Sequence, residues 1–311
     1  MRIFLFSFNQ NGFMDHDFDV AVVGGSIAGL SAAMTLGRSL RKVAVFDKGT
    51  PCNLQAPRSH NFITCDGMPP GEIIDSARKQ ISLYETVSFF EEEVLSAQRR
   101  DTGFEIATSN STFLVKKVLF ATGLRDIMPD IPGFAQCWGI SILHCPYCHG
   151  YECRGKHTGI IANGEAAYHL GTLIHNWTQD ITVLTNGVSE LRNEEREKLE
   201  ALGVRIKEDE IDEILHRDGR AQQVLFKDGT RLELHYFYAS IPFEQQSGLA
   251  ESLGCKLTGH GHIDVDDEQR TSIDGIYAAG DCTAQARAIS VAAASGTKAG
   301  FTINVELILK D

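Results

Sequence analysis

The sequence predicts an α/β protein with two Rossmann-like domains. A Val-rich strand, a glycine turn and an Ala-rich helix follow one another from Asp19. A similar order of strand, turn and helix begins again at Gly159, and a strand ending in Gly280 and Asp281 precedes a last Ala-rich helix. Strands that alternate with helices in this way are typical of a parallel sheet covered by helices.

Composition limits the class of protein. The 311 residues are enough for two domains, and 43% hydrophobic with 23% charged residues is normal for a globular chain. A net charge of -12 argues against nucleic acid or an anionic membrane surface as a partner. Eight cysteines are too sparse for a disulfide scaffold, which favours a reducing, cytoplasmic location. We expect residues 1–17 to be a loose extension, with Met14 as an alternative start.

The first glycine turn is the predicted dinucleotide site. A strand over 20–23 leads into the turn, a helix over 30–36 follows it, and Asp47 closes the next strand near the spacing expected for a carboxylate that bonds a ribose hydroxyl. Amides of such a turn and the helix dipole can hold a pyrophosphate. Ser26 replaces the usual second glycine of the motif, but the surrounding order of elements is complete. The turn reads Gly24, Gly25, Ser26, Ile27, Ala28, Gly29.

Between this turn and the middle of the chain the elements are shorter. We expect a polar, turn-rich segment up to residue 71, and then an amphipathic helix over 72–84. Short runs at 87–90, 94–98, 104–108 and 112–115 predict a small antiparallel excursion, and a separate buried strand over 118–121 ends at Thr122 and Gly123. Pro and Gly at 126–133 indicate a domain boundary.

A Cys-x-x-Cys pair flanked by histidines carries the predicted chemistry. The run is His144, Cys145, Pro146, Tyr147, Cys148, His149, Gly150. Two sulfurs at this spacing can close a small disulfide ring, and a helix start or an imidazolium can lower a thiol pKa from about 8.5 to produce the reactive thiolate. This predicts redox chemistry.

Two other interpretations of the pair stay open. It could be half of a zinc site completed by Cys153 and the histidines, although no second Cys-x-x-Cys exists. It could also be an inert buried pair. The other cysteines have no partner that the sequence assigns and are expected to be free thiols: Cys52, Cys65, Cys137, Cys255 and Cys282.

The second turn, around 162–167, is degraded. Ala162 stands where the first glycine belongs, and the next strand, 181–184, ends in Thr185, Asn186 and Gly187. That strand end has neither an acid for a 2′-hydroxyl nor an arginine for a 2′-phosphate, so nicotinamide binding is doubtful. A charged surface helix at 190–203, a hairpin over 224–238 and a helix over 288–303 complete the predicted elements.

Together these residues resemble the low-molecular-weight thioredoxin reductase family of pyridine nucleotide-disulfide oxidoreductases, from about residue 18 onward. The resemblance implies two Rossmann-like three-layer ββα domains and a homodimer. A discontinuous FAD domain would comprise 18–125 and 241–311, and a smaller inserted NAD(P)-type domain, 126–240, would carry the cysteines. The implied FAD-binding residues are Gly24, Gly25, Ser26, Ala28, Gly29, Asp47, Gly123, Gly280 and Asp281.

Two departures refine the resemblance. Typical members have an Asp where His149 stands, and a basic cluster for NADPH where this chain has Thr185 to Gly187. The run around the cysteines is more similar to the dithiol oxidases that form disulfides in gliotoxin-, holomycin- and romidepsin-type metabolites. The resemblance implies that Cys148 faces the flavin, that Cys145 exchanges with an external dithiol or disulfide, and that His149 and His144 move the proton.

The predicted function is therefore a FAD-dependent dithiol-disulfide oxidoreductase with weak or no use of NADPH. Its partner would be a small dithiol or disulfide, or a thioredoxin-like protein. Three alternatives remain: an NADPH-dependent thioredoxin-disulfide reductase with a diverged nicotinamide site, a ferredoxin-fed reductase, and a flavin-binding redox sensor without turnover.

Overall fold

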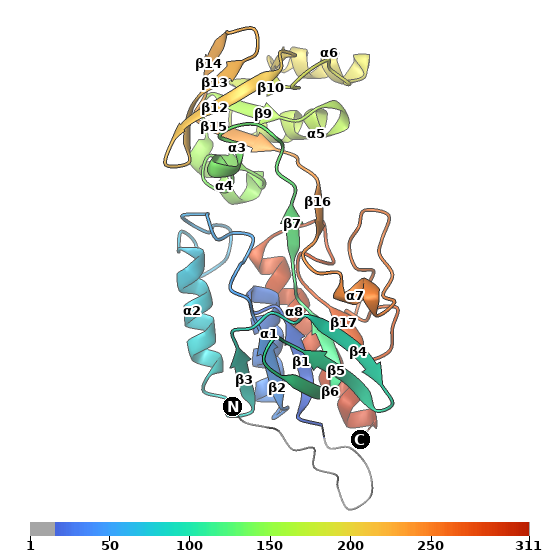
Figure 1. Ribbon diagram of the computed structural model, residues 1–311. Coiled ribbons are helices and arrows are strands. Elements are labelled where there is room, and N and C mark those ends of the chain that lie inside the picture. The colour runs from blue at the N-terminus through green and yellow to red at the C-terminus, as the bar shows by residue number, and fades with distance from the viewer. Residues whose placement is uncertain (1–15, 311) are drawn as a thin grey trace, which may run out of the picture. The chain divides into compact units, whose positions relative to one another are not determined.

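The chain forms two compact units, each described here by itself. The structure is a computed structural model that describes residues 16–310 (Figure 1). Residues 1–15 of the expected extension, Met14 among them, lie outside the described residues. The first unit contains residues up to Cys52, Gly71–Arg125 and Glu244 onward; the second contains Asn53–Pro70 and Asp126–Phe243.

A seven-stranded sheet forms the centre of the first unit. Its order is β3-β2-β1-β6-β5-β4, and β17 pairs with β6. The pairs among β3, β2, β1, β6 and β17 are parallel, whereas β4 and β5 run antiparallel beside β6. The strands are β1 (Phe18–Val23), β2 (Val43–Phe46), β3 (Val87–Phe90), β4 (Ser96–Arg100), β5 (Gly103–Ala107), β6 (Thr112–Phe120) and β17 (Ile276–Ala278).

Both faces of this sheet are buried, as is usual for parallel strands. Val20 and Val22 of β1 point into a core shared with α1 (Ile27–Arg38) and α8 (Ile289–Lys310), and Ala21 and Val23 point into a second core on the other face. Glycines let α1 and α8 approach closely, since a Cβ on Gly296 would collide with the backbone of Ala28. The remaining helices of this part are α2 (Pro70–Ile81) and α7 (Leu249–Ser252).

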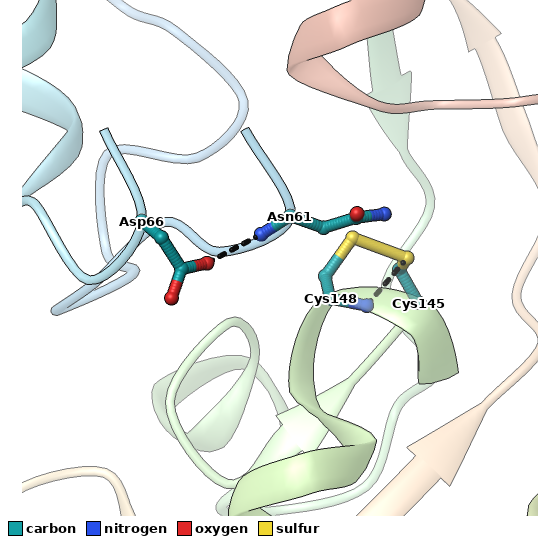
Figure 2. Close-up of a disulfide and its surroundings, with 4 residues drawn as sticks. All are labelled: Asn61, Asp66, Cys145 and Cys148. Carbon is teal, nitrogen blue, oxygen red and sulfur yellow. Dashed lines mark hydrogen bonds between the residues drawn. A yellow bond between two sulfur atoms is a disulfide. The ribbon is translucent and has the colours of Figure 1, made fainter. Parts of the chain in front are cut away.

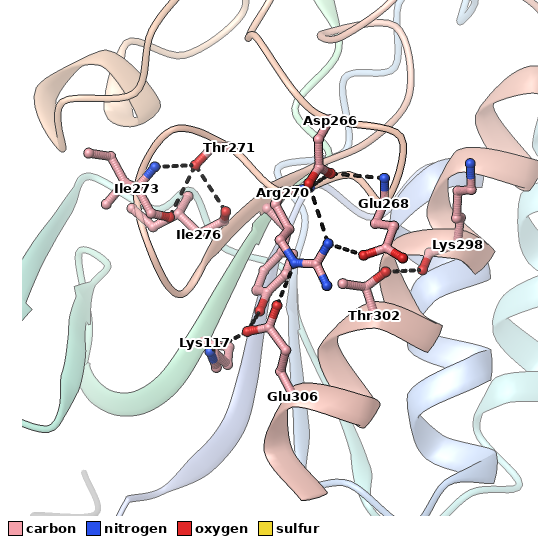
Figure 3. Close-up of polar contacts among 11 residues, drawn as sticks. Lys117, Asp266, Glu268, Arg270, Thr271, Ile273, Ile276, Lys298, Thr302 and Glu306 are labelled. Atoms are coloured by element: carbon pink, nitrogen blue, oxygen red, sulfur yellow. Dashed lines mark hydrogen bonds and ion pairs between the residues drawn. The ribbon is translucent and has the colours of Figure 1, made fainter. Parts of the chain in front are cut away.

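A partly buried ionic cluster ties α8 to the sheet (Figure 3). The Glu306 carboxylate accepts hydrogen bonds from Tyr277 Oη (2.6 Å), Arg270 Nε (2.7 Å) and Lys117 Nζ (3.1 Å). Burial by itself would raise the pKa of Glu306, but these three donors outweigh it and lower the pKa to about 2. The cluster therefore stabilises the docking of α8 only while Glu306 is ionised.

The second unit has a five-stranded parallel sheet and a three-stranded antiparallel one. The order in the first is β11-β10-β9-β15-β8, and in the second β12-β13-β14. The first consists of β8 (Ile142–Leu143), β9 (Thr158–Ile161), β10 (Ile181–Leu184), β11 (Arg205–Lys207) and β15 (Tyr236–Ala239), and the second of β12 (Ile211–Arg217), β13 (Arg220–Phe226) and β14 (Arg231–Glu233). The helices are α3 (Phe134–Cys137), α4 (Pro146–Cys153), α5 (Gly164–Ile174) and α6 (Asn193–Ala201).

The chain passes between the units four times, and two of these passages lie in β7 (Leu124–Asp126) and β16 (Phe243–Gln245), which pair as a two-stranded sheet. The inserted segment therefore ends three residues later than the expected residue 240.

The predicted α/β class is confirmed, with three local corrections. The expected runs at 112–115 and 118–121 form one strand, β6, because Lys117 is buried by its contact with Glu306 and does not interrupt the strand. The expected hairpin over 224–238 is split, because β14 pairs with β13 whereas β15 joins the parallel sheet beside β9. Residues 53–70, expected within the first unit, belong to the second, where Gln55 and Ala56 lie against Gly139.

Candidate functional site

The first glycine turn leaves its helix start open to a ligand. Gly24 has a φ of +114°, and a Cβ there would collide with the carbonyl oxygen of Ala121. A Cβ on Gly29 would collide in the same way with the carbonyl of Gly24. Ser26 is the N-cap of α1, and its side chain makes no capping hydrogen bond. The backbone amides at this helix start therefore meet the requirement for binding a phosphate.

Other candidate residues gather at the same edge of the first sheet. The register pairs Val23 with both Phe46 and Phe120, and Phe120 with Ala278, so the turns after β1, β2, β6 and β17 share one edge. Gly280, with a φ of +85°, lies against the start of α1, where its Cβ would be 2.8 Å from the Cβ of Ala28. These turns contain Gly24, Gly25, Ser26, Asp47, Gly123, Gly280 and Asp281, with Ala28 and Gly29 in the first turn of α1.

Polar groups at this edge fit a dinucleotide such as FAD. Asp47 closes β2, and its carboxylate accepts hydrogen bonds from the Gly49 amide (3.0 Å) and from the Arg78 guanidinium. Arg78 Nε and Thr122 Oγ1 are buried without a hydrogen-bond partner in the described part of the chain. Buried polar atoms are normally paired, so two orphans beside an open glycine turn indicate a site built for a polar ligand.

The second turn has the same order of strand, turn and helix, but side chains of the protein itself lie at its helix start. Asn163 is the N-cap of α5, and its Oδ1 accepts from the amides of Gly164 (2.9 Å) and Glu190 (2.8 Å). Its Nδ2 donates to the carbonyl of Val188 (2.9 Å), so the loop after β10 is tied to the helix start. The Glu190 carboxylate lies near Gly164, and Glu165 adds a second acid in the first turn of α5. Two carboxylates at a helix start oppose the binding of a pyrophosphate.

The end of β10 is likewise committed to internal bonds. Thr185 Oγ1 donates to the carbonyl of Gly187 (2.6 Å), and Asn186 Oδ1 accepts from the amide of Ile211 (2.7 Å). Neither side chain offers a cation to a 2′-phosphate, in agreement with the degraded motif of the sequence.

Cys145 and Cys148 form a disulfide at the start of α4 (Figure 2). Cys145 is the N-cap, Pro146 follows it in the first turn, and the Cys145 sulfur accepts a hydrogen bond from the Cys148 amide (3.2 Å). A sulfur at a helix N-terminus is stabilised as a thiolate by the amide and the dipole. The geometry therefore suits a pair that opens and closes by thiol-disulfide exchange.

Histidine 149 lies one residue beyond the pair, within α4. Burial chiefly lowers the pKa of His149, and the nearby His60 lowers it further, whereas Glu152 acts in the opposite direction. A neutral imidazole can accept a proton from a thiol. His144 precedes Cys145 and is exposed.

The remaining cysteines do not form disulfides with one another. No disulfide in the described part of the chain includes Cys52, Cys65, Cys137, Cys153, Cys255 or Cys282. Burial raises the pKa of Cys153 to about 11, which makes a resolving role for this thiol near the pair unfavourable.

Sequence reasoning missed the loop that supplies His60 and Asp66 to the neighbourhood of the pair. His60 lies against His149 with ring centroids 6.0 Å apart, although the two are far apart in the chain. It also missed Trp177, whose ring lies against Gly150 and edge-on to Tyr147. No spacing in the sequence connects these residues; the flanking histidines of the Cys-x-x-Cys run were the only signal of acid-base chemistry here.

Among residues 16–310, no group of three or more His, Cys, Asp or Glu side chains is arranged to hold a metal ion. No helix in the described part of the chain is both long and apolar enough to cross a membrane.

Comparison with known proteins agrees with this geometry. Residues 18–296 match the pyridine nucleotide-disulphide oxidoreductase family. The thioredoxin reductase tcpT of Claviceps purpurea is 32% identical, over 93% of this chain and 94% of the relative. A crystal structure of a putative thioredoxin reductase TrxB from Bacillus anthracis is 33% identical, with a TM-score of 0.90 over 94% of this chain and 99% of that chain.

The crystal structure of HlmI is 29% identical and has a TM-score of 0.88, over 98% of this chain and 95% of that chain. The likenesses extend across both units and therefore include the glycine turn and the disulfide together. The chain belongs to the pyridine nucleotide-disulphide oxidoreductase family, as a thioredoxin reductase-like oxidoreductase that acts on sulfur groups.

Proposed function

We propose that the protein is a FAD-dependent dithiol-disulfide oxidoreductase that uses NADPH weakly or not at all. The observation that carries the proposal is a disulfide at the start of α4, in a unit whose nucleotide turn is occupied by Asn163 and Glu190. FAD is assigned to the first unit, which comprises residues up to Cys52, Gly71–Arg125 and Glu244 onward, and the cysteine pair to the second unit. The physiological setting is assigned to the cytoplasm, where a small dithiol or a thioredoxin-like protein would be the partner.

The cysteine pair can oxidise a dithiol by two exchange steps. A substrate thiolate attacks the Cys145 sulfur, the Cys145–Cys148 bond breaks, and Cys148 leaves as a thiolate. The second substrate thiolate then attacks the substrate sulfur of the mixed disulfide, and Cys145 leaves as a thiolate. The substrate loses two electrons and two protons, and the pair gains the electrons. The Cys148 amide, which donates to the Cys145 sulfur, stabilises that leaving thiolate.

The site residues have separate tasks. His149 takes a proton from the attacking thiol, and exposed His144 is the second candidate for that task. The residues that would hold FAD are Gly24, Gly25, Ser26, Ala28, Gly29, Asp47, Gly123, Gly280 and Asp281. When bound, FAD would supply a two-electron acceptor for the reduced cysteine pair.

An anaerobic titration of the purified yellow protein tests the proposal. Dithiothreitol is expected to bleach the flavin absorbance, whereas micromolar NADPH or NADH leaves it unchanged. Rapid bleaching by NADPH would support the other candidate, an NADPH-dependent thioredoxin reductase, which agrees with the naming of the relatives from Claviceps purpurea and Bacillus anthracis as thioredoxin reductases.

Replacement of the exchanging sulfur provides a second test. Cys145→Ser is expected to lower dithiol turnover by at least about a thousandfold, because without the Cys145 sulfur no disulfide remains for the substrate thiolate to attack. Cys153→Ser, which changes a buried thiol near the pair, serves as the matched control and is expected to retain activity. Full turnover of Cys145→Ser with every dithiol would overturn the cysteine mechanism.

A homodimer is part of the same proposal. The last helix, α8, exposes Phe301, Val305 and Ile308, which lie on one face at helical spacing. Sedimentation velocity is expected to give twice the chain mass, and a single-chain mass would contradict the assembly without touching the chemistry.

A further inference from the structure

A short loop of the second unit is built to hold His60 in place. The amide of Ser59 donates to the carbonyl of Met68 (2.8 Å), and Arg58 donates to the carbonyl of Gly67 (2.9 Å), so the loop is closed at its base. Asp66 accepts a hydrogen bond from the amide of Asn61 (2.8 Å) across the loop. Figure 2 draws Asn61 and Asp66 with the disulfide. The loop therefore has a defined shape although it contains no helix or strand.

His60 lies between two carboxylates and a second imidazole. Its Nδ1 is 3.5 Å from Asp66 Oδ1, and its Nε2 is 3.8 Å from Glu152 Oε1. Its ring meets that of His149 edge to face, with an interplanar angle of 86°. The His60 side chain is 19% exposed, whereas that of Asp66 is 68% exposed. None of the roles proposed above for other residues explains why His60 is surrounded by these three groups.

We propose that His60 is a positioning residue for His149: it packs edge to face against the ring of His149 and places a second basic group beside it. The inference rests on the proposed function, because it concerns the proton that a substrate thiol loses when it attacks Cys145. In that step the sulfur-hydrogen bond breaks, His149 gains the proton, and the thiolate forms the new sulfur-sulfur bond. The oxidant is the Cys145–Cys148 disulfide itself.

The charged groups around His149 determine in which direction the pH dependence of the rate moves when His60 is removed. The groups that face it are His60 from the loop and Glu152 from α4, and Asp66 acts on His60 from the loop side. Protonated His60 disfavours a second positive charge on His149. His149 can accept a proton only when it is neutral, so the rate falls as the pH drops through its pKa. Removal of His60 is expected to move that fall to higher pH.

The test is the reduction of the disulfide in the holoenzyme by dithiothreitol, measured from pH 5 to 8. Flavin absorbance in stopped flow gives the rate, and thiol alkylation with mass spectrometry follows the Cys145–Cys148 pair directly. The rate of each variant is divided by that of the wild type, because the ionisation of dithiothreitol affects both rates equally and cancels in this ratio. For His60→Gln this ratio is expected to fall from near one at pH 8 to about one third at low pH, equivalent to a shift of about half a pH unit.

Two further variants sharpen the result. Asp66→Asn is expected to shift the profile in the same direction but less, because it removes the carboxylate beside His60 Nδ1 and leaves the His60 ring in place; it also serves if His60→Gln does not fold. His235→Gln removes an exposed histidine paired with Glu233 in the same unit, and is expected to give a ratio of one at every pH.

The outcomes separate the two proposals. A ratio that is equally low at all pH values, or equal to one throughout, would overturn the role of His60 while the dithiol reaction stands. A wild-type disulfide that dithiothreitol never reduces would overturn the proposed function, and this inference with it.

Discussion

The two βαβ turns of this chain share one plan and differ in what fills it. After β1, the start of α1 has a serine N-cap without a side-chain bond and is surrounded by close backbone approaches. After β9, the start of α5 is capped by Asn163 and faced by the Glu190 carboxylate. A helix start binds phosphate only if the protein leaves its amides free. The same element is thus open to a ligand in one unit and closed by internal hydrogen bonds in the other.

The largest effect is expected from a substitution that places a side chain in the first glycine turn. In Gly24→Ala, the new Cβ would collide with the carbonyl of Ala121 at a φ that side chains rarely adopt. We expect the affinity for flavin to fall by at least about a hundredfold and the free energy of unfolding to fall by about 3 kcal/mol. Absorbance at 450 nm per chain and urea unfolding measure these effects.

Gly248→Ala is the matched control for that substitution, because a Cβ at Gly248 meets nothing within 4 Å. It is expected to keep full colour. A yellow, stable Gly24→Ala protein would show that the close approach at this turn does not govern cofactor binding.

A second experiment tests the support beneath the first turn. Because α8 packs on α1, the cluster at Glu306 indirectly fixes the helix start. Glu306→Gln leaves Lys117 and Arg270 with a neutral partner, and we expect the free energy of unfolding at pH 7 to fall by about 3 kcal/mol. Urea unfolding measures the loss, and Glu268→Gln, at an exposed member of the cluster, is expected to cost far less.

The same substitution has a pH signature. The pKa of Glu306 is lowered in the folded state, to about 2, so its stabilisation is complete above the ordinary pKa of a glutamate and is lost as the pH falls toward 2. Wild type and Glu306→Gln are therefore expected to converge in stability between about pH 5 and pH 2. A constant difference down to pH 2 would mean that Glu306 acts by packing alone.

The smallest expected effect comes from opening the second turn. Glu190→Ala removes the carboxylate that lies near Gly164, and we expect NADPH binding to tighten by up to about tenfold, or roughly 1.4 kcal/mol. Fluorescence titration measures the affinity, with Glu194→Ala in the nearby helix α6 as the control. Unchanged affinity would place the obstacle at Thr185 and Asn186 instead.

Local patterns in the sequence predicted much of the fold and part of the site. The first turn, its strand and helix, and the Cys-x-x-Cys pair are contiguous, so their geometry follows from residues that are neighbours in the chain. Lys117 shows the limit of such reasoning: it lies between the two runs expected at 112–115 and 118–121, which form one strand, and its charge is paired with Glu306 from the last helix. Partners so distant in sequence leave no local signature.

By itself the sequence determined that one glycine turn could take a dinucleotide, that a second was degraded, and that two cysteines could form a small ring. Only the tertiary structure brought His60 against His149 and placed Glu190 over the start of α5. The physical reason is that turns and short rings depend on backbone geometry over a few residues, whereas the protonation of His149 and the charge at α5 depend on loops that close over long separations.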